Sequence, residues 1–114
     1  MLAKKFKLTD KKDFDRVQKE GEVLQSVNFG LAKVKRSDSL PSRFAFIVST
    51  KIAKEAVDRN RVKRAMSEAV RISSVNLANE YDVVFLAKPS VARVSTPDIM
   101  KEVNVALKEA GILK

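Results

Sequence analysis

Five polar side chains that can bind phosphate or a base edge are packed into six consecutive positions of this 114-residue chain. They are Arg59, Asn60, Arg61, Lys63 and Arg64. A guanidinium group can donate two parallel hydrogen bonds to phosphate, and an asparagine amide can both donate and accept at a base edge or a 2′-hydroxyl. On a helix these positions cover more than half of the circumference, so the segment can contact two nucleic-acid surfaces at once. The plainer interpretation is a solvated basic helix face.

The sequence contains few residues that could catalyse a reaction without a partner. The chain has no histidine and no cysteine, which excludes imidazole acid–base catalysis, thiolate nucleophiles and zinc sites of the usual kind. No glycine-rich phosphate-binding loop is present. The carboxylates of Asp10, Asp13 and Asp15 could hold magnesium, which would make the chain an independent metal-dependent nuclease. The favoured interpretation is instead a solvated acidic face near the positive end of a helix dipole.

The positive charge is concentrated in two segments. The chain carries a formal net charge of +9, of which residues 1–21 contribute +3 and residues 51–71 contribute +4, while residues 72–114 balance. Both positive segments also have helical patterns. This distribution is typical of a surface that binds a polyanion, and nucleic acid is the leading candidate.

Length and composition predict a single domain over residues 1–114 with a genuine hydrophobic core, because 45% of the residues are hydrophobic. The longest apolar runs, at 44–48 and 83–87, are too short to cross a bilayer, and no secretory signal follows the first residues. With no cysteine for disulfides, a cytoplasmic setting is expected.

The first expected element is a short helix behind a basic N-terminal arm over residues 1–8. Thr9 or Asp10 can cap this helix, and Gly21 supplies its end. Phe14 lies on its narrow apolar face. For a phenylalanine in such a helix, core packing is the commoner role, but an aromatic platform for an unpaired base is the alternative.

Two strands are expected next. Apolar residues alternate from Val27 to residue 31 and again over 43–49, with a turn at 35–42 between them. The phenylalanines of these strands are assigned to the core: Phe29, Phe44 and Phe46.

A long helix follows, beginning between residues 53 and 59 and ending near Ser73. Residues 81–87 form a buried strand, and a last helix begins with Thr96 as its cap and ends at Gly111. The expected core positions of the two helices are Val62, Ala65, Met66, Ala69, Ile72, Ile99, Val103, Ala106, Leu107 and Ala110. This order predicts a compact α/β sandwich with one sheet and packed helices.

The segments RFAFIVSTK at 43–51 and AVDRNRVKR at 56–64 resemble the signature of the bacterial ribonuclease P protein family. The resemblance extends over most of the chain, because it includes the Asp13-Phe14 helix with Gly21 and the strand that begins at Tyr81. It implies an α+β sandwich in the order αββ(β)αβα. The sheet would be mainly antiparallel with a left-handed βαβ crossover, like the second domain of a small-subunit ribosomal protein.

The family resemblance also implies partners and residue roles. Family members bind the catalytic RNA subunit of ribonuclease P, here through Lys51, Arg61 and Arg64. They hold the 5′ leader of precursor tRNA in a cleft, here lined by Phe14, Arg59, Asn60 and Lys63. The RNA cleaves the phosphodiester with Mg²⁺ that is bound mainly by RNA, and one protein monomer joins each RNA.

Three cleft positions depart from the family pattern. An aromatic residue is usual one turn after Phe14, and larger side chains are usual on the adjoining strand. This chain has Gln18, Gly30 and Ala32. We expect RNA-subunit binding to be preserved and leader discrimination to be weaker. A ribosomal-protein-like RNA-binding module without an enzymatic partner is the alternative function.

Overall fold

The computed structural model of the chain describes residues 6–36, 42–48, 55–73 and 81–112. The elements follow the order α1 (Lys11–Glu20), β1 (Glu22–Gln25), β2 (Phe29–Lys35), β3 (Arg43–Ile47), α2 (Ala56–Ile72), β4 (Tyr81–Ala87), the 3-10 helix η3 (Pro89–Arg93) and α3 (Thr96–Glu109). The predicted αββ(β)αβα order is confirmed, and β1 is the optional strand.

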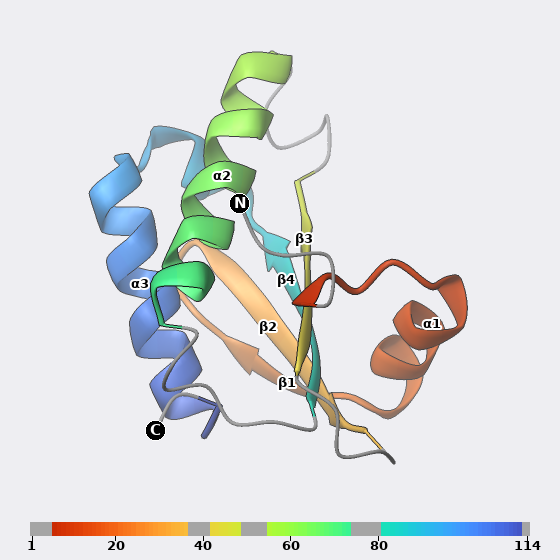
Figure 1. Cartoon of the computed structure of the whole chain (residues 1–114). Helices are drawn as coiled ribbons and strands as arrows, with labels where there is room; N and C mark the ends of the chain where they lie inside the picture. Colours follow the sequence, from red (N-terminus) through yellow and green to blue (C-terminus); the bar gives the residue numbers. More distant parts are fainter. Residues whose placement is uncertain (1–5, 37–41, 49–54, 74–80, 113–114) are drawn as a thin grey trace.

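The four strands form one mixed sheet in the order β1-β2-β4-β3 (Figure 1). β1 pairs with β2 and β2 with β4 in antiparallel fashion, whereas β3 and β4 are parallel neighbours. The chain passes from β3 through α2 to β4, and this crossover is left-handed, an exception to the usual rule. The predicted fold class is therefore confirmed.

Helices cover both faces of this sheet. α2 and α3 lie together on one face, and α1 lies on the other (Figure 1). Side chains alternate along β2, so that Phe29 and Leu31 enter the core beneath α2 and α3, while Ala32 enters a smaller cluster beneath α1. The sheet thus separates two apolar clusters of unequal size.

Helix ends largely follow the sequence signals. Asp10 caps α1 by accepting a 3.0 Å hydrogen bond from the Lys12 amide. A Cβ atom at Gly21 would lie 2.2 Å from the Val17 carbonyl oxygen, so the chain can leave α1 this closely only with glycine there. The predicted cap of α3 is wrong by one residue: Ser95, not Thr96, accepts from the Asp98 amide.

Two apolar residues of the predicted elements are exposed. Val27 was predicted to begin the alternation of a strand, but it is 80% exposed because it lies in the turn between β1 and β2. Ile72 is 62% exposed because it occupies the last position of α2, beyond the buried positions of that helix. The other predicted core positions of α2 and α3 are buried.

The end of the predicted basic arm packs against an edge of the sheet. Lys7 forms a parallel bridge with Phe44 of the edge strand β3, and the Leu8 amide donates to the Phe44 carbonyl at 2.9 Å. Leu8 is buried beneath α1. Residues 1–5 of the arm lie outside the described residues. Within the described part of the chain, each helix is too short or too polar to cross a membrane.

Candidate nucleic-acid interface

α2 carries most of the predicted RNA-binding residues and is anchored from one side. Its buried residues are Val62, Ala65, Met66, Ala69 and Val70. On its outer side Asn60, Lys63 and Arg64 are exposed, and among the described residues their side chains make no hydrogen bond or ion pair. We call these three residues the α2 ridge. Packing behind the helix fixes the ridge in place while its side chains remain available to a ligand.

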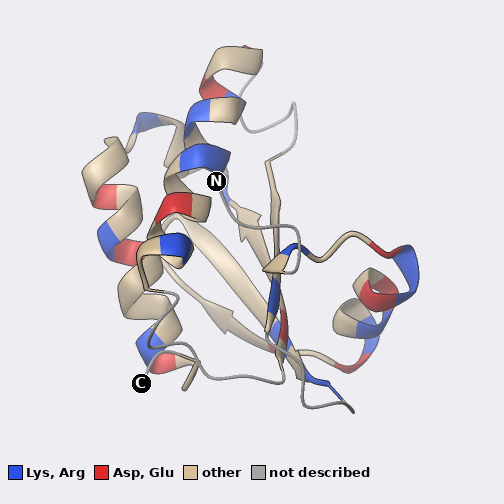
Figure 2. Ribbon diagram, viewed as in Figure 1, with Lys and Arg blue, Asp and Glu red and all other residues tan. Residues whose placement is uncertain are grey.

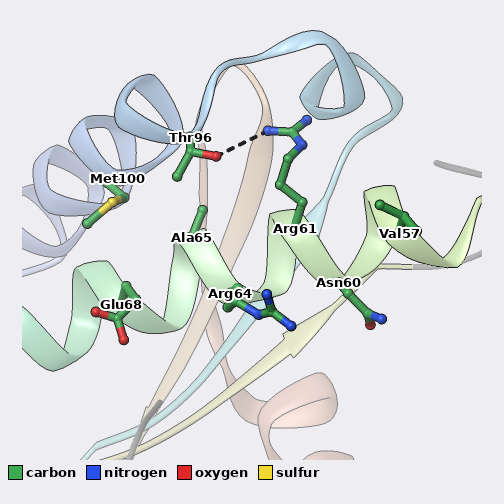
Figure 3. Close-up of a pocket in the computed structure, with 8 residues that line it drawn as sticks. All are labelled: Val57, Asn60, Arg61, Arg64, Ala65, Glu68, Thr96 and Met100. Carbon is green, nitrogen blue, oxygen red and sulfur yellow. Dashed lines mark hydrogen bonds between the residues drawn. The ribbon is translucent and has the colours of Figure 1, made fainter.

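Arg61 has a different environment from its neighbours in the ridge. Its Nη1 donates to the Val94 carbonyl at 3.0 Å and to the Thr96 hydroxyl at 3.5 Å, and its Nη2 donates to the Ala92 carbonyl at 3.2 Å. Figure 3 shows the side chain directed toward the segment that precedes α3. Arg61 therefore ties α2 to the η3–α3 connection in addition to any contact with RNA.

Two grooves lie on either side of the ridge. The larger, of about 600 Å³, lies between α2 and α3, and the smaller, of about 320 Å³, runs along α2 itself. Asn60 and Arg64 line both grooves, so they form the border between them. We call the larger one the α2–α3 groove. The remaining residues that line it are Val57, Arg61, Ala65, Glu68, Thr96 and Met100 (Figure 3).

One carboxylate stands at an end of the α2–α3 groove. Glu68 accepts from Arg71 one turn later, with Arg71 Nη2 at 2.7 Å from Glu68 Oε2. The hydrogen bond from Arg71 is the main cause that lowers the pKa of Glu68 to about 2. Glu68 is therefore ionised at neutral pH, and its charge is balanced by a neighbouring guanidinium.

Of the two remaining basic residues predicted to contact RNA in this region, the structure describes only Arg59. Arg59 is half-buried at the start of α2. The acidic residues Glu55 and Asp58 lie nearby and complement the positive end of the helix dipole. Lys51 lies outside the described residues. Figure 2 shows lysines and arginines on both α2 and α1, the helices on opposite faces of the sheet.

Phe14 lies on the opposite face of the sheet from α2. It is half-buried and packs against the smaller cluster, which includes Ala32 and Ala45. Gly30 shares that face by strand alternation, and the atoms nearest to a Cβ atom there would belong to the Gln25 side chain, at 3.4 Å and beyond. The structure therefore places the predicted leader-binding residues on two helices that lie on opposite faces of the sheet.

Sequence reasoning missed a group of ion pairs that holds α1 in place. Asp82 of β4 is fully buried and accepts from Arg16 of α1 at 2.5 Å and from Arg43 of β3 at 2.8 and 2.9 Å. Arg43 also lies 3.0 Å from Asp13 of α1. The hydrogen bond to Asp82 raises the pKa of Arg43 more than burial lowers it. The available signal was an aspartate within an otherwise apolar strand.

Comparison with known proteins decides the family. The family model described as Ribonuclease P matches residues 2–111, which is nearly the whole chain. The chain belongs to the ribonuclease P protein family. The predicted resemblance is confirmed, and the ribosomal-protein-like alternative is not favoured.

Curated relatives match over almost their full length. The ribonuclease P protein component of Caldanaerobacter subterraneus is 32% identical over 112 residues, which cover 98% of this chain and 95% of the relative. The component from Exiguobacterium sibiricum is 27% identical over 113 residues, covering 99% and 97%.

Solved structures of the ribonuclease P family share the fold. The ribonuclease P protein of Staphylococcus aureus superposes with a TM-score of 0.88 at 23% identity, covering 96% of this chain and 98% of that protein. The protein from Thermotoga maritima gives a TM-score of 0.80 at 25% identity, covering 90% and 96%.

Two of the three carboxylates that were considered for magnesium make contacts within the protein. Asp10 caps α1 and Asp13 pairs with Arg43. No group of three or more potential metal-binding side chains occurs within the described ranges.

Proposed function

We propose that this chain binds the catalytic RNA subunit of ribonuclease P and the 5′ leader of precursor tRNA, and so aids removal of the leader. Membership of the family supports participation in this endoribonuclease and implies an RNA partner. The observation that carries the proposal is the α2 ridge, which is exposed and held from behind by buried apolar side chains. A cytoplasmic location and one monomer per RNA are part of the proposal.

The proposed RNA-subunit contacts are Lys51, Arg61 and Arg64. The Arg64 guanidinium is exposed and can bind phosphate through two hydrogen bonds. Arg61 lines the same groove while it donates to the segment before α3. The charge of Arg61 is therefore held at a fixed position, while the Arg64 side chain points in another direction from the same helix (Figure 3).

The proposed leader contacts are Phe14, Arg59, Asn60 and Lys63. Because Phe14 and α2 lie on opposite faces of the sheet, a leader that contacts both must pass around the sheet. At the β3 edge such a path runs over Lys7 and Leu8, which pair with Phe44 there. The residues under α1 on that side include Gly30 and Ala32, which provide little surface for a base. This supports the expectation that leader discrimination is weaker than in relatives with aromatic residues there. In a leader-length series, an affinity gain as steep as in such relatives would contradict it.

In this proposal the RNA carries out phosphodiester hydrolysis, and the required Mg²⁺ is held mainly by RNA phosphates. The chain's own residues bind and orient RNA, and their positive charge reduces the repulsion between two polyanions. The carboxylates of α1 would then contribute to stability and not to cleavage.

The direct test is cleavage of precursor tRNA at low Mg²⁺ by the protein alone, by a ribonuclease P RNA alone and by the two together. We expect activity only in the mixture, with stimulation lost in the double variant Lys63→Gln, Arg64→Gln. Lys108→Gln, which removes an exposed charge on α3, is the matched control and should act like the unaltered chain. Binding without stimulation would favour a general RNA-binding module. Cleavage by the protein alone would overturn the proposal.

A further inference from the structure

We propose that the α2–α3 groove takes one unpaired nucleotide of the RNA subunit, with the base inside the groove and the adjacent phosphate on Arg64. This inference rests on the proposed function and extends it. It names the kind of RNA element that meets α2 at this position, namely an unstacked nucleotide and not a helical backbone.

The shape of the α2–α3 groove supports this occupant. On α2 the groove follows positions 57, 61, 64 and 68, which form one continuous stripe of a helix, and α3 closes it with Thr96 and Met100. Its volume of about 600 Å³ lies within the range of roughly 300–1,000 Å³ that is usual for small-molecule sites. A groove of this size can accommodate a whole base, whereas the outer face of a helix has no concave surface in which a base can be enclosed.

The chemistry of the lining separates into an apolar part and a polar border. Val57, Ala65 and Met100 present aliphatic or thioether surface, of which Val57 is 77% exposed and therefore leaves apolar area in water. The flat faces of a base can cover such surface. The polar edge of the base would then lie toward Asn60, Thr96 and Glu68.

The charges around the groove fix the direction of the nucleotide. Arg64 is exposed and lies on the border shared with the neighbouring groove, so a phosphate there continues the path of the RNA along the α2 ridge. Glu68 is already paired with Arg71, so among the described residues its end of the groove offers a phosphate no unpaired positive charge. The phosphate is therefore placed at Arg64, and the base lies toward the end of the groove at Glu68.

Salt dependence can separate the base contact from the phosphate contact. We would measure the affinity of the full chain for a ribonuclease P RNA at several salt concentrations. Met100→Ala and Val57→Ala should each weaken binding by about threefold to tenfold through lost apolar contact, with the salt slope unchanged. Arg64→Gln should weaken binding and make the slope shallower by about 0.7–0.9. Val105→Ala, which truncates an exposed valine of α3 outside the groove, is the matched control.

Cross-linking can identify the nucleotide. A photoreactive residue at position 57, which is exposed and can be replaced without loss of packing, should react with a nucleotide in an unpaired region of the RNA. Removing the base of that nucleotide should lower affinity at least as much as Met100→Ala, and Met100→Ala should then cost nothing further with the abasic RNA.

The outcomes distinguish this inference from the proposed function. If Arg64→Gln weakens binding while Met100→Ala and Val57→Ala do not, the inference is wrong and the proposed function stands. Cross-links confined to a base-paired segment would also overturn it. If the unaltered chain does not bind the RNA at all, the proposed function itself fails.

Discussion

On one face of the sheet, α2 and α3 pack onto large, fully buried side chains such as those of Phe29 and Phe85. On the other face, α1 contributes one buried residue, Val17, to a smaller cluster that is rich in alanine. Apolar burial is roughly proportional to area and has no direction, so it secures α2 and α3 strongly. It secures α1 much less.

Charged contacts make up the difference on the α1 face. Asp82 lies under α1 and accepts hydrogen bonds from Arg16 and Arg43, and Arg43 in turn contacts Asp13. Such contacts are directional, so they fix the orientation of α1 as well as its attachment. α2 can leave its outer face open because apolar packing, together with the contacts of Arg61, secures it from behind. α1 instead is held by two of its own charged side chains, those of Asp13 and Arg16.

The largest expected effect tests the apolar face. Leu107→Ala removes a fully buried side chain of α3, and the free energy of unfolding should fall by about 3–4 kcal/mol. Leu107→Met conserves volume and should cost less than about 1.5 kcal/mol. Urea unfolding measures both variants. A loss below about 1 kcal/mol for Leu107→Ala would mean that packing does not secure this face.

The next effect tests the charged face. Asp82→Ala leaves Arg16 and Arg43 without their common partner, and it should cost about 3 kcal/mol, the lower end for a broken buried pair because both arginines are partly exposed. Asp13→Ala removes a partly exposed pair and should cost less than about 1 kcal/mol.

Hydrogen exchange of the Asp82→Ala variant tests whether the two faces of the sheet are held separately. Amides of α1 should lose protection well before those of α3, because the apolar cluster beneath α2 and α3 is unchanged. Equal loss of protection in both helices would show that the two faces are not held separately.

A smaller loss of stability is expected for Arg61, a charged residue on the face that is otherwise held by apolar packing. Arg61→Ala removes three hydrogen bonds to the η3–α3 connection and should lower the free energy of unfolding by about 1–2 kcal/mol, less than a buried charged contact because the site is partly exposed. Arg64→Gln should leave the stability unchanged and weaken only RNA binding. If Arg61→Ala unfolds at the same urea concentration as the unaltered chain, its contacts to α3 do not stabilise the fold.

The features that sequence could predict are those with local signals. The strand over residues 81–87 and the core stripe of α3 follow from apolar spacing, and both are confirmed. The partners of Asp82 lie 39 and 66 residues away in the chain, and those of Arg61 lie 31 to 35 residues away. No spacing rule connects such positions. The α2 ridge was predictable because one helix carries it, whereas the α2–α3 groove requires Thr96 and Met100 from another helix.

The smallest expected loss of stability concerns Glu102, which forms polar contacts between α3 and the turn that precedes β2. Its carboxylate accepts from the Ser26 hydroxyl and from the Asn28 amide groups, at 2.9 Å from the backbone nitrogen. Burial raises the pKa of Glu102, but these hydrogen bonds together lower it below the ordinary 4.5. Because the folded-state pKa is the lower one, the stabilisation is fully present above pH 4.5 and is lost as the pH falls through the folded-state value.

Glu102→Ala should therefore lower the free energy of unfolding by about 1 kcal/mol at pH 7. Hydrogen bonds to a buried charged group stabilise a fold more than this, but the Glu102 carboxylate is partly exposed. Urea unfolding at pH 7 and at pH values below 4.5 should show the difference from the unaltered chain shrinking with acidification. Glu109→Ala, an exposed carboxylate on the same helix, controls for the loss of negative charge alone. If the difference in the free energy of unfolding between Glu102→Ala and the unaltered chain stays constant with pH, Glu102 contributes through packing. Its hydrogen bonds to Ser26 and Asn28 would then not hold α3 in its orientation.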